Sequence, residues 1–214
     1  MTKNVEYVLK MTERKIYLDN SATTRMGPEV KKEFDKYCLE VYGNPGSFHM
    51  EGLKAKQAVA DARERIAKIL NCKSSELVFT SGGTESINLA IKGLAYASNG
   101  KRKQIITAKT EHHAVMHTCE FLEKKGFDIV YLDVDENGIV DIEQLKNNIS
   151  DDTLLVSIMY ANNEIGTIQN ISEIGKICKE HKVKFHTDAC QAAGYLSLDV
   201  KDLNVDLMSI NGSK

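Results

Sequence analysis

The sequence predicts an α/β protein built on a mainly parallel β-sheet with helices on both faces. Short apolar runs, typical of buried strands, alternate along the chain with segments whose apolar residues recur every three or four positions, as on one face of a helix. Chains that alternate in this way form parallel sheets covered by their crossover helices. The 214 residues are 42% hydrophobic and 27% charged, which is typical of a soluble protein with a substantial core.

The first expected elements precede this alternating region. Residues 1–15 are polar and have no clear period, so we expect an N-terminal arm. Residues 16–18 have the pattern of a short strand. Pro28 stands at a favourable first-turn position of a helix that we expect to end near Leu39. Residues 53–70 have the apolar spacing of a long amphipathic helix.

The alternating region begins at residue 77. We expect a short strand over residues 77–80, a turn over residues 81–86 and a helix over residues 87–97. Further strands are expected over residues 104–107, 128–132, 154–159, 183–186 and 206–210, with helices near residues 113–124 and 171–181.

Composition excludes several classes of function. The formal net charge is −2, so no basic field indicates binding to nucleic acid or to an anionic membrane. The longest apolar runs are far too short to span a bilayer, and the first residues have no apolar signal region. The five cysteines are odd in number and include no Cys-x-x-Cys pair, which favours a cytoplasmic protein with reduced thiols.

Two of the expected strands end near groups that could serve one site. Asp188 follows the strand over residues 183–186, and Lys214 follows the strand over residues 206–210. Ligands of open α/β sheets lie beyond the carboxyl ends of the strands, so this carboxylate and amine would face one crevice. Such a pair suits pyridoxal phosphate, whose aldehyde forms a Schiff base with a lysine and whose ring nitrogen is kept protonated by an acid. Alternatively, Asp188 caps a helix and Lys214 is a solvated terminal residue.

A glycine-rich turn, Ser81-Gly82-Gly83-Thr84, lies between an expected strand and an expected helix. Glycine lets the backbone approach an anion, and the start of a helix favours phosphate. The turn matches neither the dinucleotide-binding pattern Gly-x-Gly-x-x-Gly nor a Walker loop. An equally good interpretation is a tight turn in which Thr84 caps the helix.

Three histidines near residue 113 suggest two different sites. His113 and His117 are four positions apart and would share a helix face, which is a spacing of zinc ligands, with His186 or Asp188 as a possible third ligand. The glutamate that the catalytic-zinc motif has after its first histidine is missing. His112 is the better functional candidate, because it follows a strand and would lie at the same sheet edge as Asp188.

Residues 162–166, Asn-Asn-Glu-Ile-Gly, follow another strand at that edge. Their amides and carboxylate could orient a polar ligand, although asparagine and glycine are also common in turns. Each motif is weak alone. Four strand ends in succession, however, present a polar group to one edge, and a lysine follows the last strand: Thr84, His112, Asn163, Asp188 and then Lys214.

Six ordered motifs together resemble those of the cysteine desulfurases, and more closely the group used in nitrogenase and housekeeping iron–sulfur assembly, for which Asn-Asn-Glu-Ile-Gly is a marker. The resemblance covers residues 16–214. It implies the large domain of a fold-type-I, class V aminotransferase-like enzyme. The motifs are Tyr17–Thr24 (YLDNSATT), Tyr42–Ser47 (YGNPGS), Phe79–Ser86 (FTSGGTES), Thr110–Val115 (TEHHAV), Asn162–Gly166 (NNEIG) and Thr187–Gln191 (TDACQ).

The resemblance implies pyridoxal 5′-phosphate as cofactor and assigns roles to particular residues. Lys214 would carry the cofactor, and Asp188 would pair with its ring nitrogen. His112 would stack on the ring and assist proton transfer, so Lys214 and His112 are the expected catalytic residues. Gly83 and Thr84 would hold the phosphate. Gln191 would contact the ring hydroxyl, and Asn163 would lie near the ring and the substrate carboxylate.

Two departures from the family pattern are visible. The family has Ser-Gly-His-Lys where this chain has Asn211-Gly212-Ser213-Lys214; Asn211 and Ser213 can still hydrogen-bond to a phosphate, but a possible cationic partner is lost. The family also continues for nearly as many residues again, which supply the small domain and the sulfur-accepting cysteine. We therefore expect residues 16–214 to be a large domain that is incomplete at its C-terminus, in which the strand over residues 77–80 lacks a partner.

The implied reaction removes sulfur from L-cysteine, giving alanine and an enzyme persulfide for iron–sulfur cluster assembly. The implied partners are a sulfur-accepting scaffold protein and, for the full-length form, a second copy in a homodimer. Three alternatives remain open at this point. They are another fold-type-I enzyme such as a selenocysteine lyase or an aminotransferase, a catalytically inactive fragment, and a zinc-binding module.

Overall fold

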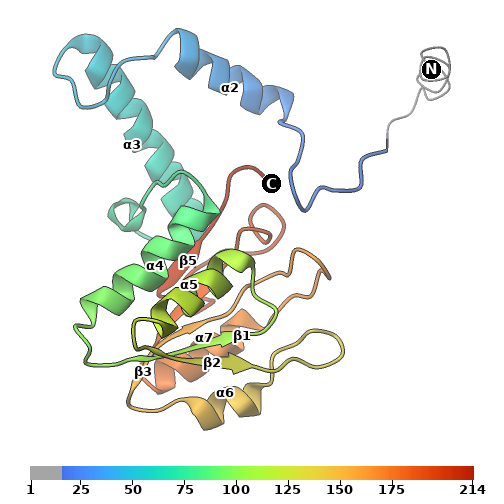
Figure 1. Cartoon of the computed structure of the whole chain (residues 1–214). Coiled ribbons are helices and arrows are strands. Elements are labelled where there is room, and N and C mark those ends of the chain that lie inside the picture. Colours follow the sequence, from blue (N-terminus) through green and yellow to red (C-terminus); the bar gives the residue numbers. More distant parts are fainter. Residues whose placement is uncertain (1–15) are drawn as a thin grey trace, which may run out of the picture.

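A parallel β-sheet of five strands lies at the centre of the computed structural model, which describes residues 16–214 (Figure 1). The strands follow the order β2-β1-β3-β4-β5, and every neighbouring pair is parallel. The predicted fold class is therefore confirmed, and all carboxyl ends meet at one edge of the sheet. The strands are β1 (Gln104–Ala108), β2 (Asp128–Leu132), β3 (Thr153–Ser157), β4 (Lys184–Asp188) and β5 (Leu207–Ser209).

Helices cover both faces of the sheet, as the sequence predicts. Helices α4 (Gly83–Ala97) and α5 (His113–Glu123) pack against each other on one face. Helices α6 (Ile142–Asn148) and α7 (Ile171–Glu180) cover the other. Sequence reasoning missed α6, because seven residues are too few to display a helical period.

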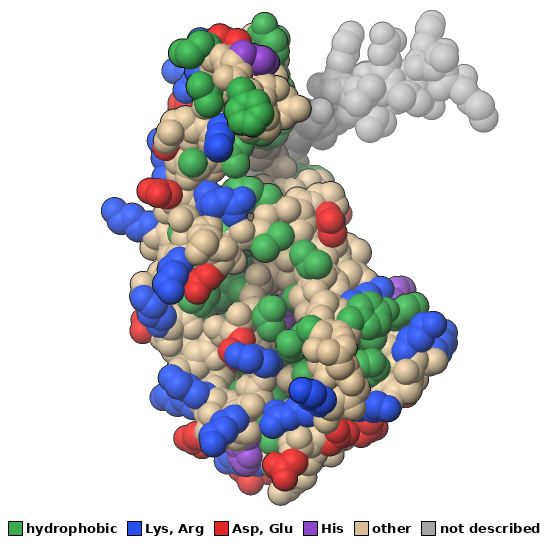
Figure 2. All heavy atoms as spheres, turned by 90° about the vertical axis from the view of Figure 1, so that its left-hand side faces the viewer, with side chains coloured by type: hydrophobic (Ala, Val, Ile, Leu, Met, Phe, Trp, Pro, Cys, Tyr) green, Lys and Arg blue, Asp and Glu red, His purple; other side chains and the backbone are tan. Residues whose placement is uncertain are grey.

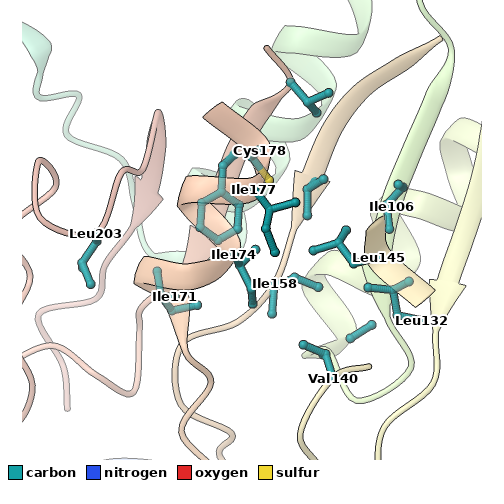
Figure 3. Close-up of a cluster of buried hydrophobic side chains, with 14 residues drawn as sticks. Ile106, Leu132, Val140, Leu145, Ile158, Ile171, Ile174, Ile177, Cys178 and Leu203 are labelled. Carbon is teal, nitrogen blue, oxygen red and sulfur yellow. The ribbon is translucent and has the colours of Figure 1, made fainter. Parts of the chain in front are cut away.

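Each face of the sheet has its own hydrophobic core. Successive strand residues point to opposite faces, so Ile106 and Val156 pack with α6 and α7, whereas Ile105 and Leu155 pack with α4 and α5. Figure 3 shows the first core, in which Leu145 of α6 and the isoleucines of α7 approach the strands. Removing this surface from water on both faces stabilises the sheet from which the candidate site is built.

Helices α2 (Pro28–Leu39) and α3 (Met50–Leu70) extend away from the sheet (Figure 1). Pro28 is at the first position of α2, as predicted, and His49 caps α3 by accepting the Gly52 amide through Nδ1 (3.3 Å). No residue of α2 is buried. Figure 2 shows hydrophobic side chains gathered on this projecting part, which includes Phe48 with 96% of its surface exposed.

Two predicted strands are wrong. Residues 16–18 are exposed and form no strand. Residues 77–80 pair with no strand in the described part of the chain, and the short 3₁₀ helix η1 (Ser74–Glu76) precedes them. The guanidinium of Arg63 instead donates to the Leu77 carbonyl and lies 4.5 Å over the Phe79 ring. An apolar run of strand-like composition becomes a strand only where a neighbouring backbone completes its hydrogen bonds.

The predicted N-terminal arm, residues 1–15, lies outside the described residues. Within residues 16–214, no helix is both long enough and apolar enough to cross a membrane.

Candidate functional site

A cavity of about 200 Å³ lies at the carboxyl edge of the sheet. Of the nine residues that the sequence singles out for a site, eight line it. Its walls come from the start of α4, from the ends of β4 and β5, and from the loops after β1 and β3. The lining residues are Gly83, Thr84, Ile87, His112, Met159, Asn163, Asp188, Cys190, Gln191, Asn211 and Lys214.

Asp188 and Lys214 share this cavity, as the order of the strands predicts. Asp188 ends β4 and is only 3% exposed; the Cys190 amide donates to its Oδ1 (3.0 Å). Its backbone carbonyl accepts the Tyr160 amide (2.9 Å), which fixes the strand end. Lys214 follows β5 and is half-buried. Lys214 thus lies on the cavity wall and is partly exposed to solvent.

The glycine-rich turn opens α4 against the end of β4. Gly82 is the N-cap, and no side chain among the described residues caps the helix. Thr84 lies inside the first turn, so the prediction that it caps the helix is wrong. A Cβ at Gly83 would lie 2.7 Å from the Cys190 Sγ, so glycine permits the close approach. The first amides of a helix lack intrahelical acceptors and favour an anion.

His112 is the N-cap of α5 and is half-buried against the cavity. Its Nδ1 accepts the Ala114 amide (3.1 Å). In the neutral ring the proton is therefore on Nε2. This hydrogen bond holds the imidazole in one orientation and leaves Nε2 as the atom that can donate or release a proton.

The two asparagines of the NNEIG motif have different positions. Asn162 performs turn chemistry: its Oδ1 accepts the amides of Glu164 (2.8 Å) and Ile165 (3.0 Å), and its Nδ2 donates to the Thr110 carbonyl (2.9 Å). Asn163 lines the cavity. Asn162 therefore has the turn role that the motif suggests, and Asn163 lies where a bound ligand could contact it.

The remaining predicted residues lie at the mouth of the cavity. Gln191 lines it and donates through Nε2 to the Ser21 carbonyl (2.7 Å). Asn211 also lines it and accepts the Ser213 amide through Oδ1 (3.0 Å). Ser213 is exposed and is the one predicted residue that is not among the lining residues. Its carbonyl accepts the Thr24 hydroxyl (3.3 Å), so the segment before α2 passes close to the mouth.

Sequence reasoning missed three lining residues, namely Ile87, Met159 and Cys190. Ile87 lies one turn after Gly83 on α4, and Met159 ends the run predicted as a strand, so helix and strand periods could have found both. Cys190 is half-buried. Burial, and then the nearby Asp188 carboxylate, raise the pKa of its thiol, which keeps it in the unreactive protonated form.

Glu111, beside His112, is a buried carboxyl group behind the cavity. Its Oε1 accepts the Met159 amide (2.6 Å), and its Oε2 has no partner among the described residues. Burial is the main cause that raises its pKa well above the ordinary value. Glu111 therefore joins the loop that carries His112 to the one that carries Asn163.

The zinc alternative gains no third ligand. The rings of His113 and His117 are 5.6 Å apart on exposed turns of α5. Within residues 16–214, however, no group of three histidine, cysteine or acidic side chains could hold a metal. His186, one suggested third ligand, is bound instead to Ser157 and Ser209.

Comparisons with known proteins agree on one relationship. A family model described as "Aminotransferase class-V" matches residues 16–214. Two relatives named "Cysteine desulfurase IscS" are each 53% identical to this chain. They come from Clostridium botulinum (strain Hall), over 201 residues, and from Methanosarcina thermophila, over 202 residues. Each alignment covers 94% of this chain, and 51% and 50% of the respective relative. The chain thus spans about half the length of the curated relatives it matches.

Two solved structures are similar as well. "SspA in complex with cysteine" has a TM-score of 0.90 at 40% identity, covering 93% of this chain and 57% of that one. "NIFS-LIKE PROTEIN" has a TM-score of 0.91 at 40% identity, covering 94% and 55%.

Proposed function

This chain belongs to the class V aminotransferase family, and on that premise we propose that it is the cofactor-holding part of a cysteine desulfurase. Such an enzyme uses pyridoxal 5′-phosphate to remove sulfur from L-cysteine, with alanine as the other product. The single observation that carries the proposal is the meeting of a buried carboxylate, a lysine amine, an imidazole and an open helix start in one cavity. The names of the relatives, and the cysteine in one similar structure's name, support the same reaction.

The donor set fits pyridoxal phosphate. Asp188 would hold the proton on the ring nitrogen, and its buried position makes that interaction stronger than it would be in water. Lys214 would carry the cofactor. When bound, pyridoxal phosphate supplies an electron sink for negative charge at the substrate α-carbon.

The phosphate would lie at the start of α4. The backbone amides there, the Thr84 hydroxyl and the Asn211 amide would hold it, because the helix dipole and orphan amides favour an anion. Ser213 would have to turn inward from its exposed position to contribute. Gln191 would contact the ring hydroxyl while its Nε2 remains on Ser21.

Proton transfer would belong to His112. Because its Nδ1 is held by the Ala114 amide, Nε2 would hold or move the proton. Asn163 would orient the substrate carboxylate. The two residues reach the cavity from loops that Glu111 and Asn162 join.

The sulfur-accepting group is expected to be none of the five cysteines described here. Burial raises the pKa of Cys119 and of Cys178 to about 12, and it also raises the pKa of Cys72 and Cys190. A thiolate is the form that attacks sulfur. Cys38 is exposed on the projecting helix α2 and does not line the cavity.

We also propose a domain assignment, a cellular location and binding partners that accompany this function. Residues 16–214 would form part of the large cofactor-binding domain, after an arm over residues 1–15. The protein would act in the cytoplasm, as a homodimer in its full-length form, and would pass sulfur to a scaffold protein for iron–sulfur cluster assembly. The exposed apolar side chains of α2 and of the loop before α3 support an additional packing partner.

The reaction is tested by its products. The chain is incubated with pyridoxal phosphate and either L-cysteine or L-selenocysteine, and amino acids, keto acids and sulfide are measured. Because none of the five cysteines is expected to accept sulfur, an added dithiol serves as acceptor: one of its thiols takes the substrate sulfur as a persulfide, and the other releases sulfide as the disulfide forms. We expect alanine and sulfide in equal amounts, both lost in Asp188→Ala. A keto acid instead would identify an aminotransferase, selenocysteine-specific turnover would identify a selenocysteine lyase, and bound cofactor without product would identify an inactive fragment. Each of these three results would overturn the desulfurase proposal.

A further inference from the structure

A chain of buried hydrogen bonds crosses the sheet beside the cavity and passes through the imidazole of His186. Its Nδ1 is 2.8 Å from the Ser157 Oγ on β3, and its Nε2 is 3.1 Å from the Ser209 Oγ on β5. The Ser86 hydroxyl of α4 donates to that same Ser209 Oγ (2.9 Å). One side chain thus connects three strands and one helix.

The network is enclosed except at Ser86, which is half-buried at its end. His186, Ser157 and Ser209 have no exposed surface. Burial lowers the pKa of His186 to about 4, so the ring is neutral at neutral pH. A neutral imidazole has one donor and one acceptor nitrogen, and a hydroxyl can take either role. Both ring nitrogens can therefore be satisfied at once. An apolar residue at this position would leave hydroxyl groups buried without partners.

The residues that the network joins are close in the chain to residues that line the cavity. Ser86 lies near the start of α4, which borders the cavity. His186 and Asp188 are two residues apart on β4, so their side chains emerge on the same face. Ser209 ends β5, and the segment after it leads to Lys214. Nothing in the proposed chemistry uses His186 itself, which does not line the cavity.

We propose that His186 is a positioning residue: through Ser209 and Ser86 it fixes the start of α4 relative to the ends of β4 and β5. It thereby sets the distance between the groups that hold the phosphate and those that hold the ring of pyridoxal phosphate. The identity of that ligand rests on the proposed function. The effect of His186 on the position of α4 does not require the cofactor and is measured without it.

The test uses two variants and one matched control in the full chain. His186→Leu removes both ring hydrogen bonds, and Ser86→Ala removes only the connection to α4. His181→Gln changes an exposed histidine at the end of α7. Amide hydrogen exchange is measured without cofactor, and the Kd for pyridoxal phosphate is measured by absorbance.

In both variants we expect the amides of residues 86–89, which donate the first backbone hydrogen bonds of α4, to exchange about tenfold faster, as a locally loosened segment would. In His186→Leu the amides of residues 189 and 190 should exchange faster as well. Pyridoxal phosphate should bind about tenfold more weakly, a loss of about 1.4 kcal/mol. His181→Gln should match the wild type in both measurements. If His186→Leu does not fold, Ser86→Ala and the milder His186→Gln are compared with the wild type in its place.

Unchanged exchange at the start of α4 in the folded variants would overturn the proposal. So would an equal increase across every strand, because that result indicates a general loss of stability. A wild-type chain that binds no pyridoxal phosphate would contradict the proposed function, whereas the exchange data would still decide the role of His186.

Discussion

At the scale of single residues, the site depends on groups whose hydrogen bonds fix their chemical form. His112 is held through Nδ1 by the Ala114 amide, and His186 is kept neutral between two serines. Glu111 is the least expected of these groups, because it is buried and one of its carboxyl oxygens has no partner within residues 16–214. Such a group prefers its protonated form, since burial disfavours the charge.

Glu111 therefore gives a testable pH dependence. Its pKa is raised by burial from an ordinary value of 4.5, so above that pH the folded chain binds more protons than the unfolded chain. The free energy of unfolding should consequently fall as the pH rises from about 4.5 toward the folded-state pKa. Glu111→Gln keeps an acceptor for the Met159 amide and should remove this decline. Glu111→Ala leaves that amide unpaired and should cost about 1–3 kcal/mol.

The measurement is urea unfolding of the three proteins between pH 4.5 and pH 8. Equal slopes of stability against pH in the wild type and in Glu111→Gln would show that Glu111 does not carry the effect.

At the scale of elements, the decisive arrangement is the start of α4 pressed against the end of β4. The contact depends on Gly83, because an added Cβ would lie 2.7 Å from the Cys190 sulfur. The same closeness brings the free amides of the helix to the edge where Asp188 ends its strand. A phosphate held by the helix and a ring held by the aspartate could then belong to one small molecule.

This packing predicts a coupling between two substitutions. Gly83→Ala should destabilise the chain by about 1–3 kcal/mol, because a well-packed contact has no room for a methyl group. In a Cys190→Ala background most of that cost should disappear. Gly93→Ala is the matched control on the same helix: no atom of residues 16–214 lies within 4 Å of a Cβ added there, so it should stabilise α4 by about 0.5–1 kcal/mol. Denaturant unfolding of the four proteins in the double-mutant cycle gives the coupling, and an equal cost of Gly83→Ala in both backgrounds would contradict it.

The sequence was most informative where an element is long or regularly patterned. The five strands of the sheet and helices α2, α3, α4, α5 and α7 were all predicted, some with ends shifted by a few residues. The strand over residues 16–18 failed because pairing depends on a neighbouring backbone that composition does not reveal. Residues 77–80 find no partner strand within residues 16–214, as the expectation of an incomplete domain predicts, and so do not form a strand. Helix α6 was too short to show a period.

The site was largely predictable for a topological reason. Parallel strands bring their following residues to one edge, so His112, Asn163, Asp188 and Lys214 meet in one cavity. Gly83 and Thr84 reach the same cavity from the start of α4, although the strand predicted before them does not form. The roles of Glu111 and His186 could not be predicted. Both depend on partners far along the chain, Met159 and the two serines, that only the folded sheet brings into contact.

At the scale of the whole molecule, a sheet with two cores supports a site on one edge, while α2 and α3 project from it (Figure 1). The segment before α2 returns to the cavity mouth, where it contacts Gln191 and Ser213. Widely separated parts of the chain therefore meet at the proposed cofactor site. The proposed function depends on Lys214 being the residue that carries pyridoxal phosphate.

The most direct measurement is borohydride reduction of the chain loaded with pyridoxal phosphate, followed by peptide mass mapping, with Lys214→Arg as the control. We predict one reduced pyridoxal phosphate per chain, on the peptide that contains Lys214, and none at a specific position in the control. No label in the wild type, or label spread over exposed lysines equally in both proteins, would contradict the account.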